Sequence, residues 1–91
     1  MLILLTYTLK PGCREAFFAT VHELGMPQVV QQEEGCLRYD YFLSPDQPDQ
    51  VLLIEEWASE KHQQAHMETP HMKAFMRLKP DFVLSTIGKT Y

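Results

Sequence analysis

The chain has 91 residues, of which 45% are hydrophobic, and a formal net charge of −4 at pH 7. An acidic chain of this size without a basic run excludes nucleic acid and anionic membrane surfaces as expected partners, and no run reaches the roughly 18 apolar residues of a membrane span. The two cysteines, Cys13 and Cys36, form no CxxC motif. We therefore expect a single domain over residues 1–91 that is reduced and cytoplasmic.

The first half of the chain predicts one strand and one interrupted helix. Residues 2–9, LILLTYTL, are rich in strand-forming side chains and lack the basic region and cleavage site of a signal peptide. A helix is predicted from Arg14, where apolar residues recur at helical spacing. Gly25 and Pro27 should interrupt it, and residues 28–34 should continue it up to a terminating glycine.

The second half predicts three strands and two short helices. Strands are expected over residues 37–43 and 51–57, with a proline-containing loop between them, and a fourth strand over residues 82–88. The two helices lie between the third and fourth strands. The order β-α-β-β-α-α-β is typical of a ferredoxin-like α+β unit, in which all helices cover one face of a four-stranded sheet.

Two of the predicted strands are apolar on both faces. The runs Leu2–Leu5 and Val51–Ile54 are continuously hydrophobic, whereas a strand with one wet face should alternate. No predicted segment remains to cover the second face of the sheet. We therefore expect a homodimer in which two sheets pack face to face.

The predicted helices carry three of the four histidines. Ser59 and Thr69 are expected to cap the two helices. Polar side chains occupy most of the first helix, which leaves a thin face of His62, Ala65 and His66. Because a helix must bury some face, we expect His66 to point inward.

A second histidine, His71, lies in the first turn of the second helix. The positive end of that helix favours a neutral imidazole, whereas His66, near the negative end of its own helix, is favoured in the charged form. Environments that diverge in this way separate acid from base roles, so His71 and His66 are candidate catalytic groups. The alternative is structural, with His66 tying its helix to the sheet through Glu55 or a backbone carbonyl.

Apolar and aromatic residues define a candidate pocket between the helices and the sheet. Trp57 and Glu55 share one strand face by the period of two. Trp57 can serve as a stacking wall for a flat substrate or as plain core. Tyr39 can orient a substrate or seal the core. Together with Met72 and Phe75, these side chains are the expected substrate-binding residues.

A metal site is not expected from the sequence. His62 and His66 have the i, i+4 spacing that can chelate an ion, but neither a third ligand nor an HExxH motif accompanies them.

Several segments together resemble the antibiotic biosynthesis monooxygenase family. They are KPG after the first strand, EEGCLRYDYF entering the second, IEEW and AHMETPHMKAF. The resemblance covers essentially the whole chain and is closest to the bacterial quinol monooxygenases of that family. It implies a dimeric α+β barrel and oxygenation of quinols or related small aromatic compounds by dioxygen, with no metal, haem or flavin cofactor.

The same family includes haem-degrading proteins, which resemble one another in an Asn on the first strand and a haem-ligating His late in the last short helix. Here Thr6-Tyr7-Thr8 and Phe75-Met76 occupy those places, which disfavours haem degradation.

Three interpretations remain open. The first is a cofactor-independent monooxygenase. The second is an isomerase of a small phosphorylated metabolite, for which Arg38, Lys73 and Arg77 are the only nearby cations. The third is a non-catalytic dimer that binds a hydrophobic ligand. The apolar character of the expected pocket favours a flat aromatic ligand over a phosphorylated one.

Overall fold

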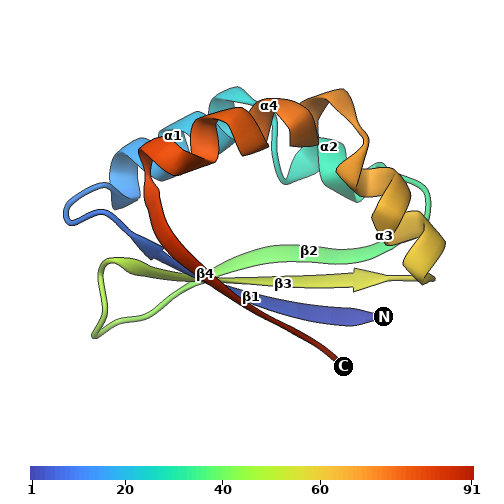
Figure 1. The fold of residues 1–91 in the computed structure, drawn as a ribbon, viewed down its shortest axis with the longest axis horizontal. Coiled ribbons are helices and arrows are strands. Elements are labelled where there is room, and N and C mark those ends of the chain that lie inside the picture. The colour runs from blue at the N-terminus through green and yellow to red at the C-terminus, as the bar shows by residue number, and fades with distance from the viewer.

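The computed structural model describes residues 1–91 as an antiparallel sheet with helices on one face (Figure 1). The strand order is β2-β3-β1-β4, and every neighbouring pair is antiparallel. This arrangement confirms the predicted ferredoxin-like α+β fold. The strands are β1 (Leu2–Leu9), β2 (Cys36–Leu43), β3 (Gln50–Trp57) and β4 (Val83–Thr90).

The helices form one layer above the sheet (Figure 1). No helix is long and apolar enough to cross a membrane. The helices are α1 (Arg14–Glu23), α2 (Gln28–Gln31), α3 (Glu60–Met67) and α4 (Pro70–Leu78), with a short 3-10 turn, η1 (Lys79–Asp81), before β4.

The predicted helix over residues 28–34 was too long. Only Gln28–Gln31 is helical, and the N–H groups of Gln32 and Glu33 donate to carbonyls three residues earlier, at 3.3 and 3.0 Å. These tighter turns end at Gly35, whose φ of +80° lies in the region that favours glycine. The chain therefore turns away from the helix axis at Glu33, which matters for the site described below.

Both predicted helix caps are confirmed. The hydroxyl of Ser59 accepts a hydrogen bond from the N–H of His62, and the hydroxyl of Thr69 accepts one from the N–H of Met72, each at 3.3 Å. Pro70, which has no N–H to lose, begins α4. The starting residues of α3 and α4 are thus fixed by side-chain contacts.

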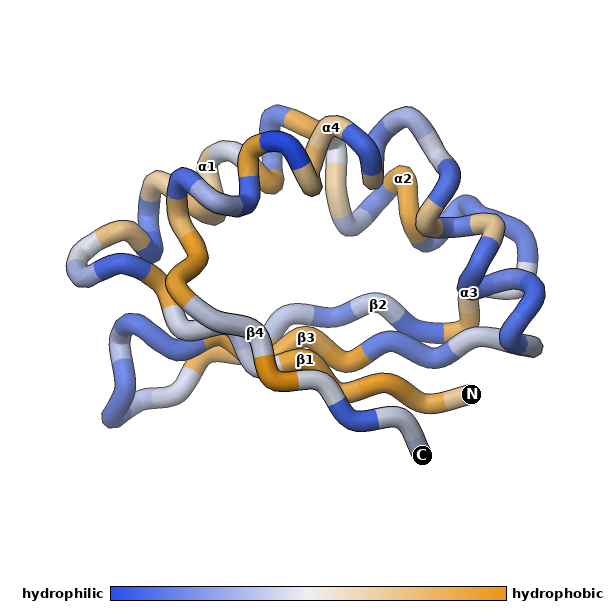
Figure 2. The backbone as a smooth tube through the Cα atoms, in the orientation of Figure 1, coloured by the Kyte–Doolittle hydropathy of each residue, from blue (hydrophilic) through white to orange (hydrophobic).

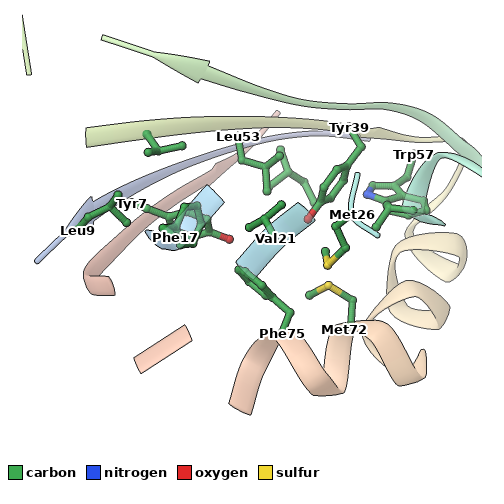
Figure 3. Close-up of a cluster of buried hydrophobic side chains, with 13 residues drawn as sticks. Tyr7, Leu9, Phe17, Val21, Met26, Tyr39, Leu53, Trp57, Met72 and Phe75 are labelled. Atoms are coloured by element: carbon green, nitrogen blue, oxygen red, sulfur yellow. The ribbon is translucent and has the colours of Figure 1, made fainter. Parts of the chain in front are cut away.

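An apolar core fills the space between the helix layer and the sheet. Figure 3 shows Met72 and Phe75 reaching from α4 toward Tyr39 and Leu53 on the sheet. Near the other end of this core, Phe17 on α1 lies 5.2–6.3 Å from five aromatic rings, measured between centroids. Those rings belong to Tyr7, Phe18, Tyr41, Phe75 and Phe82.

No segment of residues 1–91 covers the second face of the sheet (Figure 1). Leu4 lies opposite Ile54, and Leu52 lies opposite both Thr6 and Phe42, so these side chains share that face. The strong hydrophobicity of β1 and β3 is visible in Figure 2. The sequence-based prediction of strands that are apolar on both faces is confirmed.

Candidate functional site

The carboxylate of Glu33 joins two histidines from different helices. Its Oε2 atom lies 2.8 Å from Nδ1 of His66 on α3 and 2.7 Å from Nε2 of His71 on α4. The side chain of His66 is 1% exposed, that of Glu33 is 13% exposed and that of His71 is 17% exposed. The cluster therefore runs from the protein interior to its surface.

The inner end of this cluster rests on the sheet. The ring of His66 packs on Trp57, with centroids 4.6 Å apart, and meets Tyr39 at 5.8 Å. Its Nε2 atom has no hydrogen-bond partner and lies 3.9 Å from Oε1 of Glu55, too far for a hydrogen bond. The prediction that His66 points inward is confirmed. Its hydrogen bond, however, is to Glu33 and not to Glu55.

Glu55, on the sheet, is a buried carboxyl that lies beyond His66. Its Oε1 atom accepts a hydrogen bond of 3.0 Å from Nε1 of Trp57. Burial raises the pKa of Glu55, and the Trp57 hydrogen bond and the charge of His66 oppose that rise only in part. Glu55, His66, Glu33 and His71 thus alternate carboxyl and imidazole groups from the sheet to solvent.

Glu33 sets the tautomer of His71. An ionised carboxylate can only accept hydrogen bonds, so Nε2 of His71 must carry the proton of the bond that joins them. In the neutral ring Nδ1 is then unprotonated, and it has no hydrogen-bond partner in the protein. An imidazole whose outer nitrogen is free and whose inner nitrogen is held by a carboxylate is suited to act as a general base.

The predicted substrate-binding residues are all buried, and Tyr39, Trp57, Met72 and Phe75 pack in one hydrophobic core instead of lining an open pocket. Tyr39, Glu55 and Trp57 surround His66. Phe75 packs with Phe17 and Tyr7 in the aromatic core, and Met72 is buried beside it on α4 (Figure 3). Tyr39 also lines a surface cavity of about 260 Å³ with residues of β2 and Gln31.

Phenol groups near Glu55 stay protonated at neutral pH. Burial raises the pKa of Tyr41 to about 12, and burial likewise raises the pKa of Tyr7 and of Tyr39 above its ordinary value. These hydroxyls can therefore donate hydrogen bonds but do not supply a base.

The predicted inward face of α3 was partly wrong. Ala65 is exposed, and His66 is the only buried residue of α3. His62 binds the hydroxyl of Ser59 through Nδ1 at 2.7 Å, and its ring lies where a side chain at Gly35 would stand. Thus His62 does not join His66 in an i, i+4 pair.

Glu33 is the candidate site residue that the sequence analysis missed. The sequence predicts a helical segment over residues 28–34 that includes Glu33, and nothing in the pair Glu33-Glu34 marks which carboxylate turns inward. The available signal was Gly35, because a glycine that ends a helix redirects the residues before it.

The fold and the cluster define a small α+β protein with a carboxylate-held histidine at the edge of its core. A family model described as antibiotic biosynthesis monooxygenase matches residues 1–78, and the chain belongs to this family. The family resemblance seen in the sequence is therefore confirmed.

Individual relatives agree with this assignment. The probable quinol monooxygenase YgiN of Escherichia coli (strain K12) is 39% identical over 54 residues, which cover 50% of this chain and 52% of that protein. The match thus spans about half the length of this relative.

Solved structures share the fold over nearly the whole chain. Protein SO0527 from Shewanella oneidensis has a TM-score of 0.86 at 25% identity, covering 99% of this chain and 86% of its own. PA3566 from Pseudomonas aeruginosa has a TM-score of 0.84 at 25% identity, covering 97% and 87%.

Proposed function

We propose that the protein is a cofactor-independent monooxygenase that acts on quinols or related small aromatic compounds. The observation that carries this proposal is the hydrogen bond from Nε2 of His71 to Glu33, which leaves Nδ1 free to take a proton. Membership of the antibiotic biosynthesis monooxygenase family and the partial match to a probable quinol monooxygenase support it.

The reaction requires a base before it requires an oxidant. A quinol that loses a hydroxyl proton becomes an anion able to give an electron to dioxygen. One oxygen atom then enters the ring, and the other leaves as water with two hydrogens of the substrate. His71 takes the first proton, and Glu33 stabilises the resulting imidazolium through the existing hydrogen bond.

The first turn of α4 can also hold the substrate anion. Pro70 has no N–H, and Thr69 caps the N–H of Met72. The N–H of His71 is among those that a helix leaves without an internal partner, and it lies at the positive end of the helix. The base and a donor for the oxyanion therefore come from the same residue.

The isomerase alternative lacks a phosphate site at the cluster. Arg38 pairs with Asp40 at 2.9 Å, and Lys73 pairs with Glu68 at 3.5 Å, all with largely exposed side chains. Neither cation contacts the histidines, and Arg77 is exposed on α4. A phosphorylated substrate would find no convergent cations beside His71, which supports an uncharged aromatic substrate.

We further propose that the uncovered sheet face packs against a second copy of the chain. Ile87 on β4 lies opposite Thr6 and is 64% exposed, so it extends the apolar row that Leu52 and Phe42 begin. Obligate homodimer interfaces commonly bury about 2,000 Å² or more. Sedimentation should give twice the chain mass for the wild type and a lighter species for Ile87→Lys; a stable wild-type monomer at micromolar concentration would refute the dimer.

The proposed activity is tested by oxygen uptake in chelator-treated protein. We expect uptake with at least one member of a panel of quinols, anthrones and naphthols, because the base and the donor belong to the chain itself. Activity that is abolished by chelator and restored by one metal would contradict the cofactor-independent mechanism.

A further inference from the structure

We propose that Glu33, His66 and His71 bind a divalent transition-metal ion of the zinc class. The ligand atoms are Oε2 of the carboxylate, Nδ1 of His66 and Nε2 of His71, which all lie within 4.8 Å of one another. Two imidazoles and a carboxylate suit ions of borderline softness such as Zn²⁺ and Fe²⁺. This inference does not rest on the proposed monooxygenase activity.

The cluster must adjust by about one ångström to hold an ion. A tetrahedral ion with bonds of about 2.0–2.2 Å holds its ligand atoms about 3.4 Å apart. In the structure Oε2 lies 2.8 and 2.7 Å from the two imidazole nitrogens. An ion entering between them pushes the Glu33 oxygen outward by about 0.6–0.7 Å, and the two imidazole nitrogens, which lie within 4.8 Å of each other, must come to about 3.4 Å. The side chains of Glu33 and His71, which are both near the surface, can make these movements.

The unpartnered nitrogen of His66 is a separate observation that points to the same ligand. In a neutral ring the hydrogen bond to Glu33 places the proton on Nδ1, so Nε2 is bare and faces the carboxyl of Glu55 at 3.9 Å. A metal on Nδ1 displaces that proton to Nε2, which can donate to Glu55 once the 3.9 Å separation closes to hydrogen-bond distance. Histidines that bind metals commonly donate their other N–H to a carboxylate in this way.

The surroundings of the cluster favour binding and leave one position open. Glu55 is itself held by Trp57, and α3 and α4 are capped, so both imidazoles are fixed before an ion arrives. The partial exposure of Glu33 and His71 gives an ion a route from solvent. With three protein ligands, a fourth position remains for water or a small anion.

Metal binding and base function are alternative uses of one cluster. The ion would take Nε2 of His71, the atom that now donates to Glu33, and so remove the hydrogen bond that fixes the base. We therefore expect Zn²⁺ to replace the proton that His71 Nε2 now donates to Glu33.

Titration calorimetry of metal-free protein with Zn²⁺ tests the site directly. We expect one ion per chain, with affinity that falls on acidification because protons compete for the imidazoles. Glu33→Gln and His71→Asn should each weaken binding by at least about tenfold, and Glu55→Gln by about 10–100-fold, as is typical of an outer partner. Circular dichroism and melting curves establish that each variant is folded.

Two matched variants separate this cluster from other histidines. His22→Asn removes an exposed histidine of α1, and His62→Asn removes the other histidine of α3; both should bind Zn²⁺ as the wild type does. Absence of stoichiometric binding, equal binding by folded Glu33→Gln and His71→Asn, or loss of binding in His62→Asn would each overturn the proposal. None of these outcomes depends on oxygen uptake.

Discussion

The two ends of the interior between helices and sheet are built on different physical principles. At one end Phe17 is surrounded by five aromatic rings. At the other end, the ring of His66 lies between Trp57 and the carboxylate of Glu33. Aromatic packing depends mainly on buried area, whereas each buried polar group needs a particular partner.

This difference is the reason for placing the proposed reaction at the polar end. Burial of the aromatic end stabilises the fold without leaving any group that can accept a proton. At the polar end the same sheet and helices hold titratable groups in fixed positions, and His71 remains partly accessible. The comparison predicts that the two ends respond differently to substitution.

The largest effect on stability is expected at the aromatic end. Phe17→Ala removes a buried ring and should lower the free energy of unfolding by about 3–5 kcal/mol. Oxygen uptake per folded molecule should be unchanged. The half-buried neighbour Phe18 provides the control, and Phe18→Ala should cost less in denaturant unfolding. Equal losses in the two variants would contradict the central role of Phe17.

A smaller loss is expected at the polar end. His66→Ala removes the buried imidazole that lies beside Glu55 and Trp57. This change should lower the free energy of unfolding by about 1–3 kcal/mol. The remaining folded fraction should keep its turnover, because the proposed base is His71 and the His66 side chain is only 1% exposed. A loss of turnover as large as the loss expected for His71→Ala would instead place His66 in the reaction.

Helix α4 carries both His71 and Phe75 and so belongs to both ends. Its N-terminal cap should contribute about 1 kcal/mol to the free energy of unfolding. Thr69→Ala removes the acceptor for the N–H of Met72 and should lower the melting temperature accordingly. Thr20 on α1 donates to the carbonyl of Ala16 and is no cap, so Thr20→Ala is the matched control and should be nearly neutral. A Thr69→Ala variant as stable as the Thr20→Ala variant would rule out this contribution.

The smallest effect is a change in the pH dependence of stability. Burial raises the pKa of Glu55 in the folded chain above its ordinary value of 4.5, so the folded state holds this proton more tightly than the unfolded state does. Wild-type stability should therefore fall, relative to Glu55→Gln, as pH rises above 4.5. Melting temperatures of both proteins from pH 4 to 8 test this prediction. If the melting temperature of the wild type rises relative to that of Glu55→Gln as the pH increases, the prediction is contradicted.

Hydrophobic patterning and cap residues were sufficient to predict the fold. Ser59 and Thr69 have local partners three residues away, so the starts of α3 and α4 could be read from sequence. Glu33 could not be identified in this way. Its partners lie 33 and 38 residues further along the chain, and the contact exists only after α2 ends early and turns Glu33 toward α3 and α4.

The histidine contacts also divide into those that the sequence predicts and those that only the fold creates. The inward direction of His66 followed from the polarity of the rest of α3, but the choice between Glu55 and Glu33 as its partner depended on tertiary geometry. His62 and His66 have the spacing of a chelating pair, yet a hydrogen bond to Ser59 engages His62 locally. The pairing of His66 with His71 required the full fold.

The most direct test of the account is oxygen uptake by the wild type and His71→Ala with the best substrate of the quinol panel. We expect His71→Ala to lower turnover by about 10²–10⁴-fold, which is typical of the loss of a general base. The melting temperature should change far less, and His22→Ala should match the wild type. Normal turnover in folded His71→Ala would remove this residue from the mechanism and favour a ligand-binding protein without catalysis.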